Sequence, residues 1–194
     1  MSMIQRIALS LLCLFYAVYL IKMMLLRRHG ISGNLLGKGD KPAKARVIEL
    51  LLRAATGTGA VVQFASVLFP RHLPALPAGP PLSIMGLIIM ALGCTFFLPA
   101  ITVMKNNWRA GFSSNQNTSL VTWGIYRFSR NPAFVGFDLI YIGCVLACPN
   151  WINILASVLA VVLFHVQIIG EERYLAGAFG EEYLRYRTKV RRYL

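Results

Sequence analysis

Two groups of polar residues in the last third of the chain have the types and spacing to bind a ligand. The first is Arg130-Asn131-Pro132, which directly precedes an apolar run. Asn is a favoured N-cap and Pro a favoured first helical residue, so the triplet predicts a helix start with unpaired backbone N–H groups beside a cation. Such a helix start attracts an anion, for example a carboxylate. The triplet is equally compatible with a capped helix whose arginine only reaches toward the membrane surface.

The second group stands at the end of a later apolar run and comprises His165, Gln167, Glu171 and Glu172. Polar groups at membrane depth are costly and usually face a cavity or a partner. If the two apolar runs form a hairpin, Arg130 faces Glu171 across a short gap. That contact would be part of a ligand site or a structural bridge that closes the hairpin.

Asp138 lies about one and a half turns inside the first of these runs, where an unpaired carboxylate is expensive. We expect it to be hydrogen-bonded within the bundle or to pair with Arg130 or His165. A structural and a catalytic role stay open for both Asp138 and His165.

The amino-acid composition indicates what class of protein holds these polar groups in place. It has 194 residues, of which 57% are hydrophobic and 14% charged, and its mean hydropathy is +0.60. A soluble domain needs about a quarter of its residues charged, so a soluble or disordered chain is disfavoured. The net charge of +13 points to loops beside anionic lipid headgroups rather than to a nucleic-acid partner. The four cysteines lack C-x-x-C spacing, and no metal site is expected.

Apolar runs of about 20 residues are long enough to cross a bilayer core. The runs with this character are Ile7–Leu26, Leu50–Phe69, Leu82–Met104, Ala133–Cys148 and Trp151–Ile169. The fourth is short, and only Pro149 and Asn150 separate it from the fifth, which predicts an antiparallel hairpin. We therefore predict an all-α polytopic membrane protein with about five transmembrane helices, whose first run is retained rather than cleaved as a signal.

The distribution of basic residues predicts the orientation in the membrane. In a five-span arrangement, 18 of the 20 Lys and Arg residues fall on one side and only Arg6 and Arg71 on the other. The positive-inside rule then places the N-terminus outside and the C-terminus and the polar groups on the cytoplasmic side. We expect one domain over residues 1–194, with residues 1–104 as a three-span scaffold and residues 105–194 carrying the site.

The C-terminal tail has apolar and aromatic residues at helical spacing between Phe179 and Leu194, with basic residues between them. This pattern predicts a cytoplasmic amphipathic helix. The helix would lie on anionic headgroups or cover the pocket formed by the two polar groups.

The polar groups belong to longer motifs. G-x-Y-x-x-x-R-[HN]-P-x-[YF]-x-G spans Gly124 to Gly136, and E-E-x-x-L-x-x-x-F-G-x-x-Y-x-x-Y spans Glu171 to Tyr186. Their order and separation resemble the isoprenylcysteine carboxyl methyltransferase family, within a wider group of integral-membrane methyltransferases that includes phospholipid N-methyltransferases. The resemblance covers residues 118–187, about a third of the chain.

The resemblance implies S-adenosyl-L-methionine as methyl donor, held in a cytoplasm-facing pocket. By position in the motifs, the residues implied as cofactor contacts are Thr118, Ser119, Leu120, Val121, Tyr126, Asn131, Pro132, Ala133, Phe134 and Glu171. Tyr126 and Phe134 would flank the adenine, and Arg130 would hold the methionine carboxylate.

Arg130 and Gln167 are the residues that we assign to catalysis, and Gln167 also to substrate binding. Two departures from the family pattern bear on this assignment. Asn131 replaces the usual histidine, and Gln167 stands where the isoprenylcysteine enzymes carry an arginine that orients the substrate carboxylate. The implied partners are membrane lipid and a lipophilic or prenylated acceptor. A phospholipid N-methyltransferase, an NADPH-dependent sterol-type reductase and a non-enzymatic membrane adaptor or small transporter are the alternatives.

Overall fold

The computed structural model describes residues 1–39, 41–77, 79–111 and 119–194, and this part of the chain is helical, with isolated bridges but no strand. The elements, in chain order, are α1 (Met3–Arg28), α2 (Ala43–Leu68), η1 (Pro70–His72), α3 (Pro80–Met104), η2 (Lys105–Asn107), η3 (Gly124–Arg127), α4 (Pro132–Ala147) and α5 (Trp151–Lys189). The prediction of an all-α fold is confirmed.

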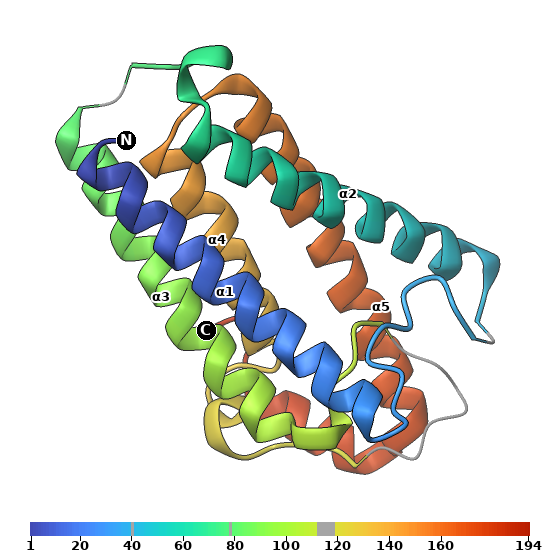
Figure 1. The fold of residues 1–194 in the computed structure, drawn as a ribbon. Coiled ribbons are helices and arrows are strands. Elements are labelled where there is room, and N and C mark those ends of the chain that lie inside the picture. Colours follow the sequence, from blue (N-terminus) through green and yellow to red (C-terminus); the bar gives the residue numbers. More distant parts are fainter. Residues whose placement is uncertain (40, 78, 112–118) are drawn as a thin grey trace.

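The five long helices form one bundle in which α4 has a central place (Figure 1). Helix α4 packs against α3, α5 and α1, while α2 packs mainly against α5. The α4–α5 hairpin turns at residues 148–150, as predicted, and Asn150 caps α5 by accepting a hydrogen bond from the backbone N–H of Asn153 at 2.9 Å.

Glycines allow α3 and α4 to approach at backbone distance. A Cβ atom on Gly93 of α3 would lie 2.9 Å from the carbonyl oxygen of Gly136 on α4, and one on Gly143 would lie 2.7 Å from that of Gly86. Close approach through small residues is a common way to pack helices in membranes. This packing fixes α4, and therefore the Arg130-Asn131-Pro132 triplet at its start, against the rest of the bundle.

Four helices, α1, α2, α3 and α5, are long and apolar enough to cross a membrane, and α4 is a shorter apolar helix. With 16 residues, α4 is about 24 Å long, which is less than the hydrocarbon core of a typical bilayer. The predicted polytopic membrane protein is confirmed in this form: four full-length spans plus one short apolar helix.

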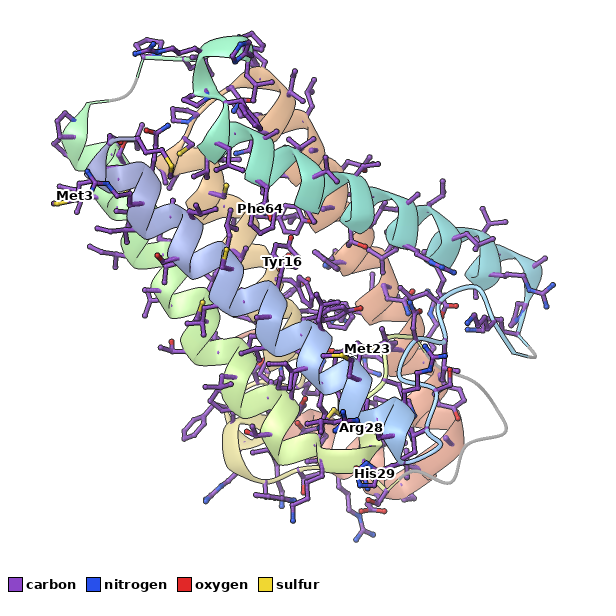
Figure 2. All side chains as sticks on the ribbon, in the orientation of Figure 1. Met3, Tyr16, Met23, Arg28, His29 and Phe64 are labelled. Carbon is purple, nitrogen blue, oxygen red and sulfur yellow. The ribbon has the colours of Figure 1, made fainter. Side chains whose placement is uncertain are left out.

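The bundle has two chemically different ends. The hairpin end comprises the start of α1, η1 and the turn between α4 and α5, while the basic end comprises the end of α1, η2, η3 and the chain after Gly170. Figure 2 shows Met3 at one end of α1 and Arg28 with His29 at the other. Hydrogen bonds join distant segments at both ends: Leu76 N–H donates to the carbonyl of Pro149 at 3.0 Å, and Lys22 Nζ to that of Lys105 at 2.7 Å.

Two helix boundaries differ from the predicted runs. Helix α2 begins at Ala43 rather than Leu50, because the residues after Pro42 continue the same helix into the polar loop. Helix α5 continues to Lys189, with a non-helical residue at Gly180, whose φ of 49° lies in the left-handed region that favours glycine. The predicted tail helix is therefore the last part of α5, and it ends five residues before Leu194.

Candidate functional site

An ion-paired group, which we call the clasp, joins the start of α4 to α5 and to the C-terminus. It consists of Arg130, Asn131, Glu172 and Arg192. Arg130 donates to Oε1 of Glu172 through Nε and Nη2 at 3.1 and 2.8 Å. Arg192 donates to the other oxygen, Oε2, at 3.1 and 2.9 Å, and this contact holds the pKa of its guanidinium above the usual range. The Glu172 side chain is only 6% exposed, so the clasp is a largely desolvated charge network.

The ion-pair partner of Arg130 differs from the one expected from the sequence. Glu171 was the expected partner, but the ion pair is made with Glu172. Consecutive residues of a helix point about 100° apart, so only one of two adjacent acids can face α4. Asn131 occupies the predicted N-cap position of α4 without capping it, and its amide donates to Oε1 of Glu172 at 3.3 Å. The anion predicted at this helix start is thus supplied by the protein itself.

Residues 190–194 are not helical: the backbone is extended at Val190 and bends at Val190 and Arg192, and we call this segment the strap. The backbone N–H of Arg130 donates to the carbonyl of Arg191 at 3.0 Å, and Arg130 Nη1 donates to that of Val190 at 2.7 Å. The Asn131 amide donates to the Arg192 carbonyl at 3.2 Å. The prediction of a helix as far as Leu194 is wrong here, because these tertiary hydrogen bonds use the carbonyls in a non-helical conformation.

Asp138 and His165 do not pair with each other or with Arg130. His165 is exposed, and its Nδ1 lies 2.5 Å from the hydroxyl of Tyr193 on the strap, with the two rings stacked. The Oδ1 atom of Asp138 is buried and has no hydrogen-bond partner among the described residues. The expected pairing of Asp138 with Arg130 or His165 is therefore wrong.

A small cavity of about 110 Å³ lies next to the clasp. Its lining includes most of the residues implied as cofactor contacts, namely Ser119, Leu120, Val121, Tyr126, Asn131 and Glu171, and it also includes Arg130. Thr118 lies outside the described residues. Pro132 is buried in the first turn of α4 and is not part of the lining.

Aromatic side chains from the last part of α5 line this small cavity. Phe179, Tyr183 and Tyr186 line it, so the tail covers the pocket, which was one of the two roles considered for it. The Tyr186 hydroxyl donates to the backbone carbonyl of Tyr126 at 2.6 Å, and burial raises the pKa of Tyr126, which keeps its phenol neutral. The Tyr183 side chain is 1% exposed, yet its hydroxyl has no hydrogen-bond partner among the described residues.

A larger cavity of about 370 Å³ lies between α1, α2, α4 and α5. Its walls are mainly apolar and aromatic, with Tyr16, Phe137 and Phe164 among them. Figure 2 shows Tyr16 on the side of α1 that faces α2, near Phe64, where the two ring centroids lie 5.7 Å apart. Ala133 and Phe134 line this larger cavity, whereas Tyr126 lines the smaller one.

A buried chain of polar side chains runs along the larger cavity. Lys41 Nζ lies 2.5 Å from Oε2 of Glu49, which also accepts a hydrogen bond from the backbone N–H of Gly37 at 2.8 Å. Gln167 is 2% exposed, and its amide donates to Oε1 of Glu49 at 3.3 Å and to Oε1 of Glu171 at 3.0 Å. Gln167 is therefore a neutral link between two carboxylates.

The two cavities share a wall, because Arg109, Gly111 and Glu171 line both of them. Gly111 has a φ of +85°, and a Cβ atom at this position would lie 3.0 Å from Oε1 of Glu49. A side chain here would meet backbone and carboxylate atoms, so glycine keeps the wall thin. The arrangement offers a small compartment whose lining includes several polar and charged residues and a larger, mainly apolar compartment, in contact at a carboxylate.

The N-terminal half also contributes residues to the candidate site, which the sequence motifs did not predict. Lys41 and Glu49 lie in a predicted loop and at the edge of a predicted span, and Arg53 and Gly57 line the larger cavity. The site region is thus not confined to residues after 104. The available signal was the rarity of acids: the chain has only 7 Asp and Glu residues, and Glu49 stands directly before an apolar run.

A match to a known protein family identifies the family of this chain. The family model described as phospholipid methyltransferase matches residues 82–182, which is more than half of the 194 residues. The chain belongs to the phospholipid methyltransferase family. The matched range contains most of α3, all of α4 and most of α5, and therefore the clasp residues Arg130, Asn131 and Glu172.

Two curated relatives confirm the resemblance found in the motifs. A protein-S-isoprenylcysteine O-methyltransferase of Schizosaccharomyces pombe is 38% identical over 77 residues, which cover 39% of this chain and 33% of that protein. One of Xenopus laevis is 32% identical over 112 residues, which cover 56% of this chain and 39% of that protein. The chain thus matches little more than a third of the length of these family relatives.

Proposed function

We propose that the protein is an S-adenosyl-L-methionine-dependent methyltransferase that acts on a lipophilic acceptor at the membrane surface. The observation that carries this proposal is the pair of unlike cavities that meet at Arg109, Gly111 and Glu171. A methyl donor and an apolar acceptor need separate compartments, and the reacting atoms must meet at the boundary between them.

The smaller cavity suits the cofactor. Its lining combines aromatic rings with hydrogen-bonding groups, and the buried Tyr183 hydroxyl lacks a partner that a polar ligand atom would supply. Ser119, Asn131 and Glu171 would hold the remaining polar groups of the ligand. The cavity is smaller than the ~300 Å³ usual for ligand sites. Binding therefore requires its walls to move apart or the ligand to extend across the shared wall.

The larger cavity suits an apolar chain. Its volume of about 370 Å³ and its aromatic lining fit a site in which most of the ligand surface is buried in apolar contacts. It lies between helices long enough to span a membrane, so an acceptor can enter from the lipid without crossing water.

The proposed reaction needs orientation and exclusion of water more than it needs proton transfer. An acceptor carboxylate forms the C–O bond to the donated methyl carbon while the C–S bond breaks and its electrons stay on sulfur, giving a methyl ester and S-adenosylhomocysteine. The protein's part is to hold the acceptor at the shared wall, because orientation alone can supply roughly 7–11 kcal/mol. The clasp contributes by fixing Arg130 and Asn131 on the wall of the smaller cavity.

Methylation of a phospholipid amine is the second candidate, and Glu171 is the observation that favours it. An amine must lose a proton before it can attack, and Glu171 lies on the wall of both cavities, where it accepts one hydrogen bond from Gln167. In this alternative Glu171 is the general base.

We further propose that the basic end of the bundle faces the cytoplasm, with the N-terminus outside. The hairpin end carries only Arg6 and Arg71 as basic side chains, and the remaining Lys and Arg residues fall toward the basic end. This charge difference follows the positive-inside rule.

A thermal-shift comparison in detergent tests the proposed cofactor. S-adenosylhomocysteine should raise the unfolding temperature, because a ligand that binds only the folded state stabilises it by mass action. NADPH at the same concentration should leave that temperature unchanged. Stabilisation by NADPH alone would favour a reductase, and no effect of either compound would favour a non-enzymatic protein.

A further inference from the structure

Arg109 is a partly buried cation with no carboxylate partner. It follows η2, and its Nη1 donates to the backbone carbonyl of Trp108 at 2.8 Å and to that of Asn106. No acidic side chain of the described residues lies within ion-pair distance of its guanidinium, and burial lowers its pKa from the usual value. Its Nε and Nη2 atoms make no hydrogen bond with the described residues and can bind a ligand.

Among the described residues, the buried cations Lys41 and Arg130 are compensated by carboxylates, whereas the partly buried Lys22 donates to the backbone carbonyl of Lys105 at 2.7 Å and has no ion pair. Lys41 pairs with Glu49, and Arg130 pairs with Glu172. A partly buried charge without a counter-ion is costly, and such charges are normally paired or bound to a ligand. Arg109 lacks such a carboxylate and, unlike Lys22, lines both cavities, so an anionic ligand in the cavity would supply its counter-charge.

A second arginine lines the same large cavity. Arg53 is an exposed residue of α2 about one turn after Glu49, and it has no ion pair with the described residues. Among the described residues that line this cavity, Glu171 is the one acid and Arg53 and Arg109 are the cations. An apolar compartment with excess positive charge at its polar end is complementary to an amphiphile with an anionic end.

We infer that Arg109, supported by Arg53, binds the anionic end of the acceptor and selects a lipophilic carboxylate. This inference rests on the proposed methyltransferase function. Neither arginine lies in the motifs between Gly124 and Tyr186 that carry the family resemblance. Gln167, at the position where the isoprenylcysteine enzymes carry an arginine, is neutral, so the orienting charge comes from other elements.

The position of Arg109 favours a carboxylate over a phosphate. Arg109 lines both cavities, so the anion that it binds lies at the shared wall, where the reacting atom must be. In a carboxylate acceptor the anion is itself the nucleophile. In a phosphoethanolamine headgroup the nucleophilic amine is several bonds from the phosphate, so a phosphate bound by Arg109 would leave the amine displaced from the wall.

The test compares a carboxylate and a neutral acceptor in the purified full-length protein in detergent. The probes are N-acetyl-S-farnesylcysteine and its carboxamide, and the variants are R109Q, R109K and R53Q. The matched control is R28Q, since Arg28 is exposed and lines neither cavity. Affinity for each probe, methyl-transfer KM and kcat, and affinity for S-adenosylhomocysteine are measured for every variant.

Loss of a charged hydrogen-bonding partner should weaken carboxylate binding on the order of 30-fold in R109Q. The carboxamide affinity should stay the same, so the preference for the carboxylate disappears, while R109K retains part of it and R53Q shows a smaller loss. R28Q should behave as the wild type. Affinity for S-adenosylhomocysteine should be unchanged in R53Q and R28Q, and in R109Q its loss should be clearly smaller than the loss for the carboxylate.

Three results would overturn the inference while leaving the methyltransferase in place. They are an unchanged carboxylate preference in R109Q, a loss in R109Q confined to S-adenosylhomocysteine, and wild-type methylation of phosphatidylethanolamine in preference to the carboxylate. Failure of the wild type to bind S-adenosylhomocysteine would instead reject the proposed function itself.

Discussion

Different kinds of polar contact join the chain segments at the two ends of the helix bundle. At the hairpin end, neutral groups join the segments: the Asn150 amide donates to the Ser66 hydroxyl at 2.9 Å, and the Gln5 amide donates to the Val67 carbonyl at 2.9 Å. At the basic end, buried charges join them through the clasp and through the Lys41–Glu49 pair.

This difference indicates what each end is for. Neutral hydrogen bonds are sufficient to close a helical hairpin, and they avoid the desolvation cost of buried ions. The protein nevertheless buries Glu49, Glu172 and Arg130 at the basic end. This is also the end where the smaller cavity meets the larger one. We therefore propose that the hairpin end serves the fold, whereas the basic end combines folding with the proposed ligand binding.

Removing the central carboxylate of the clasp should have the largest effect. Glu172→Ala leaves Arg130 buried without its counter-ion and releases Arg192, and breaking a buried ion pair in this way costs about 3–5 kcal/mol. The free energy of unfolding in detergent should fall by this amount, and affinity for S-adenosylhomocysteine should fall with it. Glu182→Ala, at an exposed position of the same helix, is the control and should leave both unchanged. Equal stability of the two variants would show that the clasp is not a structural requirement.

A neutral contact at the hairpin end should matter less, and only for stability. Asn150→Ala removes the cap of α5 and the hydrogen bond to Ser66, which together should cost about 1–2 kcal/mol. Thermal unfolding measures this loss, and affinity for S-adenosylhomocysteine should be that of the wild type. A tenfold loss of affinity in this variant would mean that the two ends are coupled, contrary to the comparison above.

The sequence was sufficient to predict the elements of the fold but not their polar contacts. Runs of apolar residues and the Pro149-Asn150 turn predicted the helices and the α4–α5 hairpin, because burial in lipid leaves a strong compositional signal. The motifs brought Tyr126, Asn131 and Glu171 to one cavity, as the resemblance implied.

Three features depended on geometry that spacing alone does not contain. The choice of Glu172 over Glu171 as the partner of Arg130 depends on the rotation of α5 by one residue. The strap depends on tertiary hydrogen bonds that override a helical pattern. The Lys41–Glu49 pair joins a loop to a helix and reaches Gln167 only because α2 packs against α5.

Calorimetric titration of S-adenosylhomocysteine is the most direct test of the central claim that the small cavity at the basic end binds the cofactor. The wild type should bind one equivalent, and Glu171→Ala should bind at least about tenfold more weakly because a charged hydrogen-bond acceptor is lost. Asn150→Ala should bind as tightly as the wild type. The same affinity in all three proteins, or no binding by the wild type, would contradict the assignment of this site.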